Sequence, residues 1–293
     1  RAHRAQDRHL AAARVERGMA SDVAGAHGLR GDDGRSRGDD GGLIRQPALD
    51  LAATANPNLA ASSTLMEPSM LKIFGTPVSV HTRKVQLGLR AKGLDHELRV
   101  VIPIVPDTLP ENWSSLSPTG LIPVIEDGAL TLPDSSAILH YLETKHPRAP
   151  LIPADPVQRG RAIWFDAYLG AFFRDVMHPL FHQRVVAPMQ GMAPDKDLME
   201  RVLSERVPRY FEYLESQIDG DWLVGDAFSI ADIAVGANLV LFKYLGETVP
   251  TDRFPALSTY FRRLLTLPAF IEQLADEKPF AVQMGFSQES MTA

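Results

Sequence analysis

Asp134 and Ser135 are the residues whose types and placement most directly suggest a binding site in this chain. They stand where the apolar positions of a helix begin to recur, at Ile138 and Leu142. The free N–H groups and the dipole of a helix N-terminus favour a carboxylate. Pro123 begins the strand before this helix, one of the few strand positions that accepts a residue without an N–H. The pattern predicts a corner that holds a small, peptide-like ligand.

Composition excludes or disfavours several other kinds of chemistry. The chain has no cysteine, so a cysteine nucleophile, a thiolate metal site and a disulfide framework are excluded. Its histidines, among them His140, His146, His178 and His182, show no HExxH or comparable grouping, and we expect no metal. A chain without disulfides suits the cytoplasm, which is the expected location.

An α/β domain over residues 70–147 must position the corner. The expected strands are 71–75, 96–102, 123–126 and 129–132, and the expected helices are 82–92, 135–145 and a short one around 111–116. Two strands joined through a helix should be parallel, whereas the hairpin marked by Asp127 and Gly128 should be antiparallel. This β-α-β, β-β-α order predicts a thioredoxin-like domain with a mixed four-stranded sheet.

The rest of the chain has helical periodicity throughout. After a linker at 146–156, the expected helices are 157–188, 195–218, 229–245, 255–265 and 268–275. Ser229 and Asp232 form a capping box, and Phe228 with Ile233 forms a hydrophobic staple; these we interpret as structural. The prediction is an all-helical domain at 157–285 and a tail at 286–293.

Residues 1–69 differ in composition from everything that follows. They contain nine Arg, nine acidic residues and no aromatic residue, and such a segment cannot bury enough apolar surface to offset its ordering entropy. We expect a disordered extension. A further hypothesis is that translation begins at Met70 or Met66 and that the extension is not part of the native protein.

Charge and hydropathy narrow the range of partners. The formal net charge is −6, all of it contributed by residues 70–293, whereas a nucleic-acid-binding surface would be basic. The most apolar long window, 230–242, contains Asp232 and Asn238 and is too short for a membrane span. We therefore expect neither nucleic acid nor a membrane as a partner.

Four segments together resemble the glutathione transferase family, over essentially all of residues 70–285. In chain order they are PVSVHTRKV after the first strand, SPTGLIPVIEDG, LPDSSAILHYL and FSIADI. The likeness is to bacterial-type, serine-dependent members of the phi and theta kind. It implies a thioredoxin-like domain that binds glutathione as co-substrate, a helical domain that completes an electrophile pocket, and a homodimer.

The resemblance also implies roles for the residues of the corner. In the family, the residue before a cis-proline makes strand-like hydrogen bonds to the cysteinyl backbone of glutathione; here these are Ile122 and Pro123. Asp134 and Ser135 match the acidic residue and the serine that hold the γ-glutamyl group. Leu121 departs from the Lys or Gln that many members carry, and Asp134 is shorter than the common Glu, so both departures should weaken glutathione binding.

Ser79 resembles the family's catalytic serine, whose hydroxyl donates a hydrogen bond to the glutathione thiolate. Lowering a thiol pKa of about 8.5 by about two units needs roughly 2.7 kcal/mol. One hydrogen bond to a charged group contributes about 1.5–3 kcal/mol, so a single hydroxyl and the helix dipole suffice. Ser79 can also cap the helix, and the two roles are compatible. Thr82 is the rival hydroxyl, and Arg83 should form a structural ion pair.

The electrophile pocket should lie against the first long helix of the second domain. Its candidate walls are His81 and the helical stripe Tyr168, Phe172, Phe173, Met177 and His178. A stripe of this kind is also typical of a helix core. It suggests an apolar electrophile.

The predicted function is conjugation of glutathione to an apolar electrophile, as in detoxification, with the thiol ionised through Ser79. Glutathione-dependent dehalogenation, peroxide reduction and isomerisation on the same scaffold are alternatives. A non-catalytic protein-interaction module is the alternative from another class. Ser79 and Asp134–Ser135 disfavour the module, whereas Leu121 leaves it open.

Overall fold

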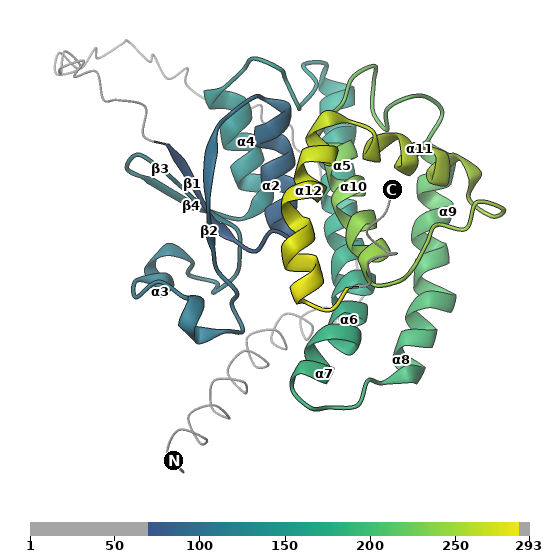
Figure 1. The fold of residues 1–293 in the computed structure, drawn as a ribbon. Helices are drawn as coiled ribbons and strands as arrows, with labels where there is room; N and C mark the ends of the chain where they lie inside the picture. Colours follow the sequence, from purple (N-terminus) through teal and green to yellow (C-terminus); the bar gives the residue numbers. More distant parts are fainter. Residues whose placement is uncertain (1–69, 287–293) are drawn as a thin grey trace, which may run out of the picture. The chain divides into compact units, whose positions relative to one another are not determined.

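A mixed four-stranded sheet begins the part of the chain that the computed structural model describes, residues 70–286 (Figure 1). The expectations for residues 1–69 and for residues 287–293 lie outside it. The strands, in the spatial order β2-β1-β3-β4, are β1 (Leu71–Gly75), β2 (His96–Val100), β3 (Val124–Asp127) and β4 (Leu130–Pro133). Strand β1 runs parallel to β2 and antiparallel to β3, which pairs antiparallel with β4. The predicted thioredoxin-like arrangement is confirmed.

The two faces of the sheet are covered by different helices. Side chains alternate along a strand, so Ile73 packs with α2 (Val80–Ala91) and α4 (Ser135–Lys145), whereas Phe74 packs with α3 (Trp113–Leu116). A short 3₁₀ turn, η1 (Pro106–Thr108), lies in the crossover before α3. Helix α2 also contacts two helices of the second domain, α10 and α12 (Figure 1). Residues at the start of α2 can therefore take part in a site shared by the two domains.

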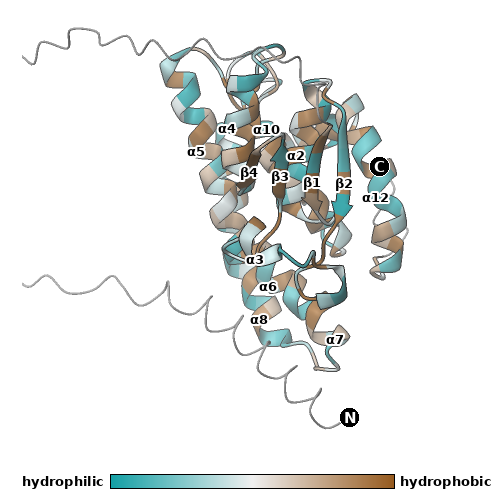
Figure 2. Ribbon diagram, turned by 90° about the vertical axis from the view of Figure 1, so that its left-hand side faces the viewer, coloured by the Kyte–Doolittle hydropathy of each residue, from teal (hydrophilic) through white to brown (hydrophobic). Residues whose placement is uncertain are grey.

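The second domain is helical and is centred on a buried helix. Its α-helices are α5 (Pro156–Phe172), α6 (His178–Phe181), α7 (Ala187–Met189), α8 (Lys196–Arg201), α9 (Val207–Gln217), α10 (Ile230–Tyr244), α11 (Pro255–Leu265) and α12 (Pro268–Gln283). Nearly every residue of α10 is buried, and Figure 2 shows the brown of apolar residues along it. Within residues 70–286, no helix is both long and apolar enough to cross a membrane.

Wide turns interrupt the two helices expected at 157–188 and 195–218. They are π-helical and are η2 (Phe173–Met177), η3 (His182–Val186) and η4 (Val202–Arg206). Each ends two residues before a proline, which has no N–H to continue the α-helical pattern. The carbonyl of Asp175, four residues before Pro179, instead accepts a hydrogen bond from Arg206 Nη1 at 2.9 Å. The prolines thus explain why two long helices become several shorter ones.

The capping box at the start of α10 is present as predicted. The side chains of Ser229 and Asp232 and the backbone N–H groups of the first turn satisfy one another reciprocally. The Asp232 carboxylate also accepts from the backbone N–H of Leu223 at 3.0 Å and from the Tyr260 hydroxyl. The box is buried and structural.

The prediction that the last helix ends at residue 275 is wrong. Helix α12 continues to Gln283 and contains Pro279 in its interior. Proline usually ends or kinks a helix because it lacks a donor, yet the packing of α12 on α2 continues through Glu277. The added turns carry Glu277, which pairs with Arg83 of α2.

Candidate functional site

Ser79 caps helix α2 and keeps its hydroxyl proton free. Its backbone is extended, with φ −70° and ψ 130°, and its Oγ accepts a hydrogen bond from the N–H of Thr82 at 3.5 Å. A hydroxyl that accepts in this way still has its own O–H to donate. Ser79 is partly exposed. The geometry is therefore compatible with both roles considered for this residue, helix cap and donor to a ligand.

Thr82, the rival hydroxyl, is enclosed by the protein. It is 0% exposed, and its Oγ1 lies against the end of β1. A Cβ at Gly75 would stand 2.4 Å from that oxygen, which shows how closely the two segments pack. A ligand that approaches the start of α2 thus has access to Ser79 and not to Thr82.

The start of α4 presents unused polar groups. Asp134 is its N-cap, and one carboxylate oxygen accepts from the N–H groups of Ser136 and Ala137, both at 2.9 Å. The other carboxylate oxygen and the N–H of Ser135 have no hydrogen-bond partner within residues 70–286. Asp134 has a φ of 77°, which is uncommon for a residue other than glycine and recurs at functional sites. A negatively charged hydrogen-bond acceptor, the Asp134 carboxylate, therefore lies beside a hydrogen-bond donor, the Ser135 N–H.

The Ile122–Pro123 peptide bond is cis, as the family resemblance implied. In the described part of the chain, the N–H and C=O of Ile122 have no hydrogen-bond partner. Pairing of Phe74 with Val124 places Pro123 beside the end of β1, and Asp134 N–H donates to the Pro123 carbonyl at 3.3 Å. A free peptide edge thus lies between the starts of α2 and α4.

Leu121, two residues earlier, has its apolar side chain in solvent. The side chain is 52% exposed, and its backbone carbonyl accepts from the Ser117 hydroxyl at 2.7 Å. It has no polar atom with which to hold a ligand carboxylate. The departure noted in the sequence is therefore located at the rim of the site.

His81 connects the two helix starts to the helical domain. Its Nδ1 lies 3.4 Å from the hydroxyl oxygen of Ser135, and its ring meets the ring of Phe173 edge-on at 4.5 Å between centroids. These contacts join α2, α4 and η2. They bring two of the predicted site residues, Ser135 and Phe173, into contact with one imidazole.

A buried charge cluster beneath His81 was not predicted from the sequence. Lys84 Nζ lies 2.5 Å from Asp166 of α5 and donates to Ser136 Oγ at 3.2 Å, and that hydroxyl donates to Asp166 at 2.5 Å. The Lys84 and Asp166 side chains are only 5% and 6% exposed. The sequence signal that could have indicated this cluster is the presence of charged residues at inward-facing positions of α2 and α5. The cluster fixes the second residue of α4, next to Ser135.

His81 is neutral at physiological pH. Burial, helped by the positive charge of Lys84, lowers its pKa from 6.5 to about 4. The unfolded chain binds this proton near pH 6.5 and the folded protein only near pH 4, so acidification through that window favours unfolding. We expect the His81 contribution, up to about 3 kcal/mol, to be lost between pH 6.5 and 4. The check is denaturant unfolding at several pH values, with His81→Gln as the control; an equally steep pH dependence in that variant would contradict the assignment.

The residues of the predicted aromatic stripe lie in three different surroundings. Phe173 reaches His81, and His178 lies 6.3 Å from the Phe173 ring. Phe172 and Met177 are 0% exposed in the helical core, so the structure does not place them at the surface of a pocket. Tyr168 packs instead with an aromatic group at the outer side of α5 and α9, namely Trp164, Tyr210 and Tyr213.

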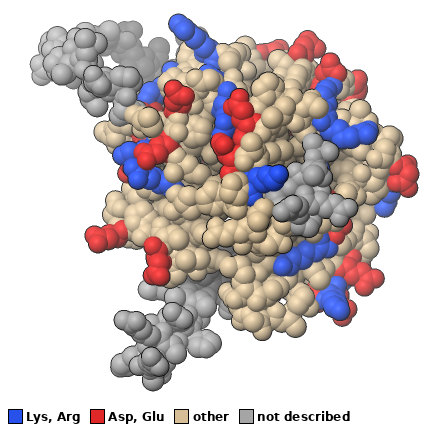
Figure 3. Space-filling model, viewed as in Figure 1, with Lys and Arg blue, Asp and Glu red and all other residues tan. Residues whose placement is uncertain are grey.

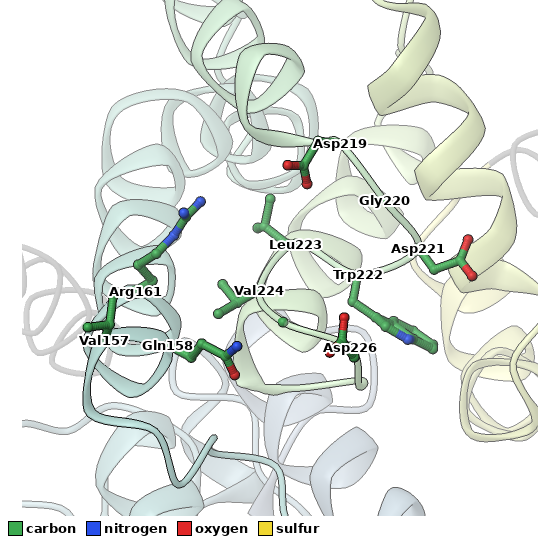
Figure 4. Close-up of a pocket in the computed structure, with 11 residues that line it drawn as sticks. Val157, Gln158, Arg161, Asp219, Gly220, Asp221, Trp222, Leu223, Val224 and Asp226 are labelled. Atoms are coloured by element: carbon green, nitrogen blue, oxygen red, sulfur yellow. The ribbon is translucent and has the colours of Figure 1, made fainter.

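A hollow of about 620 Å³ lies elsewhere, between the first turns of α5 and the loop before α10 (Figure 4). Arg161 and Asp219 face it from opposite sides, and Trp222 and Asp226 line its other end. None of the residues gathered around His81 lines it. It is a separate surface feature and not part of the site.

The charged side chains on the face shown in Figure 3 form no patch of one sign that would indicate a further site. Lys and Arg side chains alternate with Asp and Glu across the face in Figure 3. Among the described residues, no three His, Asp or Glu side chains are grouped as a metal site would require.

The groups at the starts of α2 and α4 can together bind a small ligand that has a peptide edge, an ammonium and a carboxylate.

Comparison with known proteins supports the assignment of the fold. The model of "Glutathione S-transferase, N-terminal domain" matches residues 73–150, and that of "Glutathione S-transferase, C-terminal domain" matches residues 173–268. The FtsZ-localized protein A of Caulobacter vibrioides is 31% identical over 213 residues, which cover 69% of this chain and 90% of that protein.

Solved structures give the same result. A glutathione S-transferase from Rhodospirillum rubrum has a TM-score of 0.64 at 27% identity, covering 70% of this chain and 92% of that one. One from Methylobacterium radiotolerans, in complex with glutathione sulfonate, has a TM-score of 0.59 at 27% identity, covering 70% and 94%.

Proposed function

Because the chain belongs to the glutathione S-transferase family, we propose that it binds glutathione at the start of α2 and α4 and transfers it to an apolar electrophile. The observation that carries the proposal is that three features lie around the starts of α2 and α4, each with a hydrogen-bond donor or acceptor that has no partner in residues 70–286. They are the Ser79 hydroxyl, the peptide edge of Ile122, and the Asp134–Ser135 pair.

Each feature suits one part of the tripeptide. The N–H and C=O of Ile122 can pair with the cysteinyl backbone as one strand pairs with another. The free oxygen of Asp134 can accept from the γ-glutamyl ammonium, and the N–H and hydroxyl of Ser135 can donate to its carboxylate. Bound in this way, the ligand would direct its cysteinyl side chain toward Ser79 at the start of α2.

Ser79 then stabilises the thiolate and remains chemically unchanged. Its O–H and the N-terminal end of α2 both favour the ionised thiol, which is the nucleophile. Phe173 and the neutral His81 present apolar ring surface beside this position. We therefore propose an apolar electrophile and a detoxifying conjugation.

A charge-only substitution at Asp134 tests the γ-glutamyl assignment. Asparagine caps a helix as well as aspartate does, but it has no charge. We expect Asp134→Asn to raise the Kd for glutathione about tenfold or more, because a hydrogen bond to a charged group contributes about 1.5–3 kcal/mol. The melting temperature should stay near that of wild type. Titration calorimetry with glutathione gives the Kd.

Asp134→Ala provides the matched comparison. It removes both the charge and the cap, so it should weaken binding and also lower stability by about 1 kcal/mol. Glutathione affinity unchanged in the asparagine variant would contradict the proposed contact.

A non-catalytic interaction module is the second candidate. The observations that favour it are the 31% identity to FtsZ-localized protein A and the exposed, apolar Leu121 at the glutathione rim. On this alternative a partner protein, and not glutathione, is the ligand. No retention on immobilised glutathione would favour the module over the enzyme.

We further propose that the protein is a cytoplasmic homodimer. Trp164 is 51% exposed and lies beside the Tyr168 ring, and Val157, two turns earlier on α5, is 72% exposed. Large apolar side chains grouped at a surface often mark a contact with another chain. Light scattering of the purified protein tests the state of association.

A further inference from the structure

Arg83, four residues after Ser79, forms a fully buried ion pair with the last helix. Its Nε and Nη2 donate to the two carboxylate oxygens of Glu277 in α12, both at 2.7 Å, and both side chains are 0% exposed. Tyr244 and Gln273 also donate to Glu277, at 3.1 and 2.9 Å. The carboxylate is thus held by three side chains, and it fixes the plane of the guanidinium.

The same guanidinium holds the loop that carries Ser79. Arg83 Nη2 donates to the backbone carbonyl of Val78 at 3.2 Å. On the other side of the loop, Thr76 Oγ1 donates to the Val101 carbonyl at 2.7 Å, and Ser79 N–H donates to the Thr76 carbonyl at 3.0 Å. The peptide before Ser79 is therefore attached at one end to the sheet and at the other to Arg83.

We propose that Glu277 is a positioning residue for Ser79: through Arg83 it holds the Val78 carbonyl and so sets the direction of the Ser79 hydroxyl. Without Glu277 the buried guanidinium would carry an uncompensated charge and would turn toward other acceptors. The contact to Val78 would then be lost, although no residue of the glutathione site had been changed. The inference rests on the proposed function, since its consequence is a change in thiolate stabilisation.

The test compares two carboxylates of α12 that both pair with α2. Glu277→Gln removes the buried charge, whereas Glu272→Gln removes an exposed partner of Arg90, at the other end of α2. Two readouts are taken on each full-length variant. One is the exchange rate of the Ser79 amide, which needs no ligand, and the other is the pH titration of the thiolate absorbance of bound glutathione.

We expect Glu277→Gln to speed exchange at Ser79 and to lower the ratio of thiolate to thiol at pH 7 about threefold, equivalent to half a pKa unit. Glu272→Gln should match wild type in both. Equal effects in the two variants, or no effect in either, would overturn the inference. If wild-type protein shows a slow Ser79 amide but no bound thiolate, the proposed function fails and the exchange data still decide the loop's support.

A double substitution keeps the test decisive if Glu277→Gln does not fold. Apolar residues of similar volume often replace a buried ion pair without loss of stability, so Arg83→Met with Glu277→Leu should fold while leaving Val78 without its donor. It should show the same faster exchange and the same fall in the ratio of thiolate to thiol. A stable double variant that behaves as wild type would overturn the inference.

Discussion

Ser79→Ala is expected to lower the rate of glutathione conjugation about 25-fold at pH 7. Without the hydroxyl, the pKa of the bound thiol returns from about two units below its usual 8.5 toward that value, and the ionised fraction falls from about three quarters to a few per cent. The measurement is kcat/KM with a chloro-nitroaromatic electrophile. The difference in kcat/KM between this variant and wild type should shrink as the pH is raised toward 9, because the thiol then ionises without the help of Ser79.

Ser79→Gly separates this role from helix capping. Glycine is a far better N-cap than alanine, so the glycine variant should keep nearly all of the stability that alanine loses. Both variants lack the hydroxyl and should lose activity equally. If Ser79→Gly kept both stability and activity while Ser79→Ala lost both, Ser79 would serve as a helix cap alone.

Arg83→Met is expected to lower the free energy of unfolding by about 3–5 kcal/mol. The substitution leaves the Glu277 carboxylate buried and without its counter-ion, and an uncompensated buried charge has a cost of that size. Denaturant unfolding monitored by circular dichroism gives the value. A loss of less than about 1 kcal/mol would mean that water or a neighbouring cation reaches Glu277.

Arg90→Met is the matched control for this prediction. Arg90 lies on the same helix and pairs with the same partner helix, but its partners Glu272 and Asp276 are mostly exposed. Exposed pairs contribute about 0–1 kcal/mol, so this variant should stay close to wild type. Most of the stability lost in Arg83→Met should return when Glu277 is replaced by leucine in the same chain.

The sheet and the corner could be predicted because short segments determine them. The apolar residues of β1 and β3, the hairpin at Asp127–Gly128, and the helix start at Asp134 are each recognised from neighbouring residues. The cis bond before Pro123 and a structural ion pair of Arg83 were also expected, and both are present. Which partner Arg83 takes could not be predicted, because Glu277 is distant in sequence and lies beyond the residue where the last helix was expected to end.

The electrophile side of the site was less predictable for a geometric reason. Consecutive helix residues point about 100° apart, so Phe172 and Phe173 cannot both face one pocket. The structure places Phe172 in the core and Phe173 against His81, a choice set by the packing of α9 and α10 and not by the stripe itself. The wide turn η2, which depends on Pro179, shifts the helical phase again after Phe173.

Titration of the thiol of glutathione bound to wild-type protein tests whether Ser79 stabilises the thiolate. The ultraviolet absorbance of the thiolate is followed against pH at saturating protein, with free glutathione as reference. We expect a midpoint about two pH units below that of the free thiol, and a return toward the free value in Ser79→Ala. Tight binding of glutathione with an unshifted midpoint would contradict this role of Ser79.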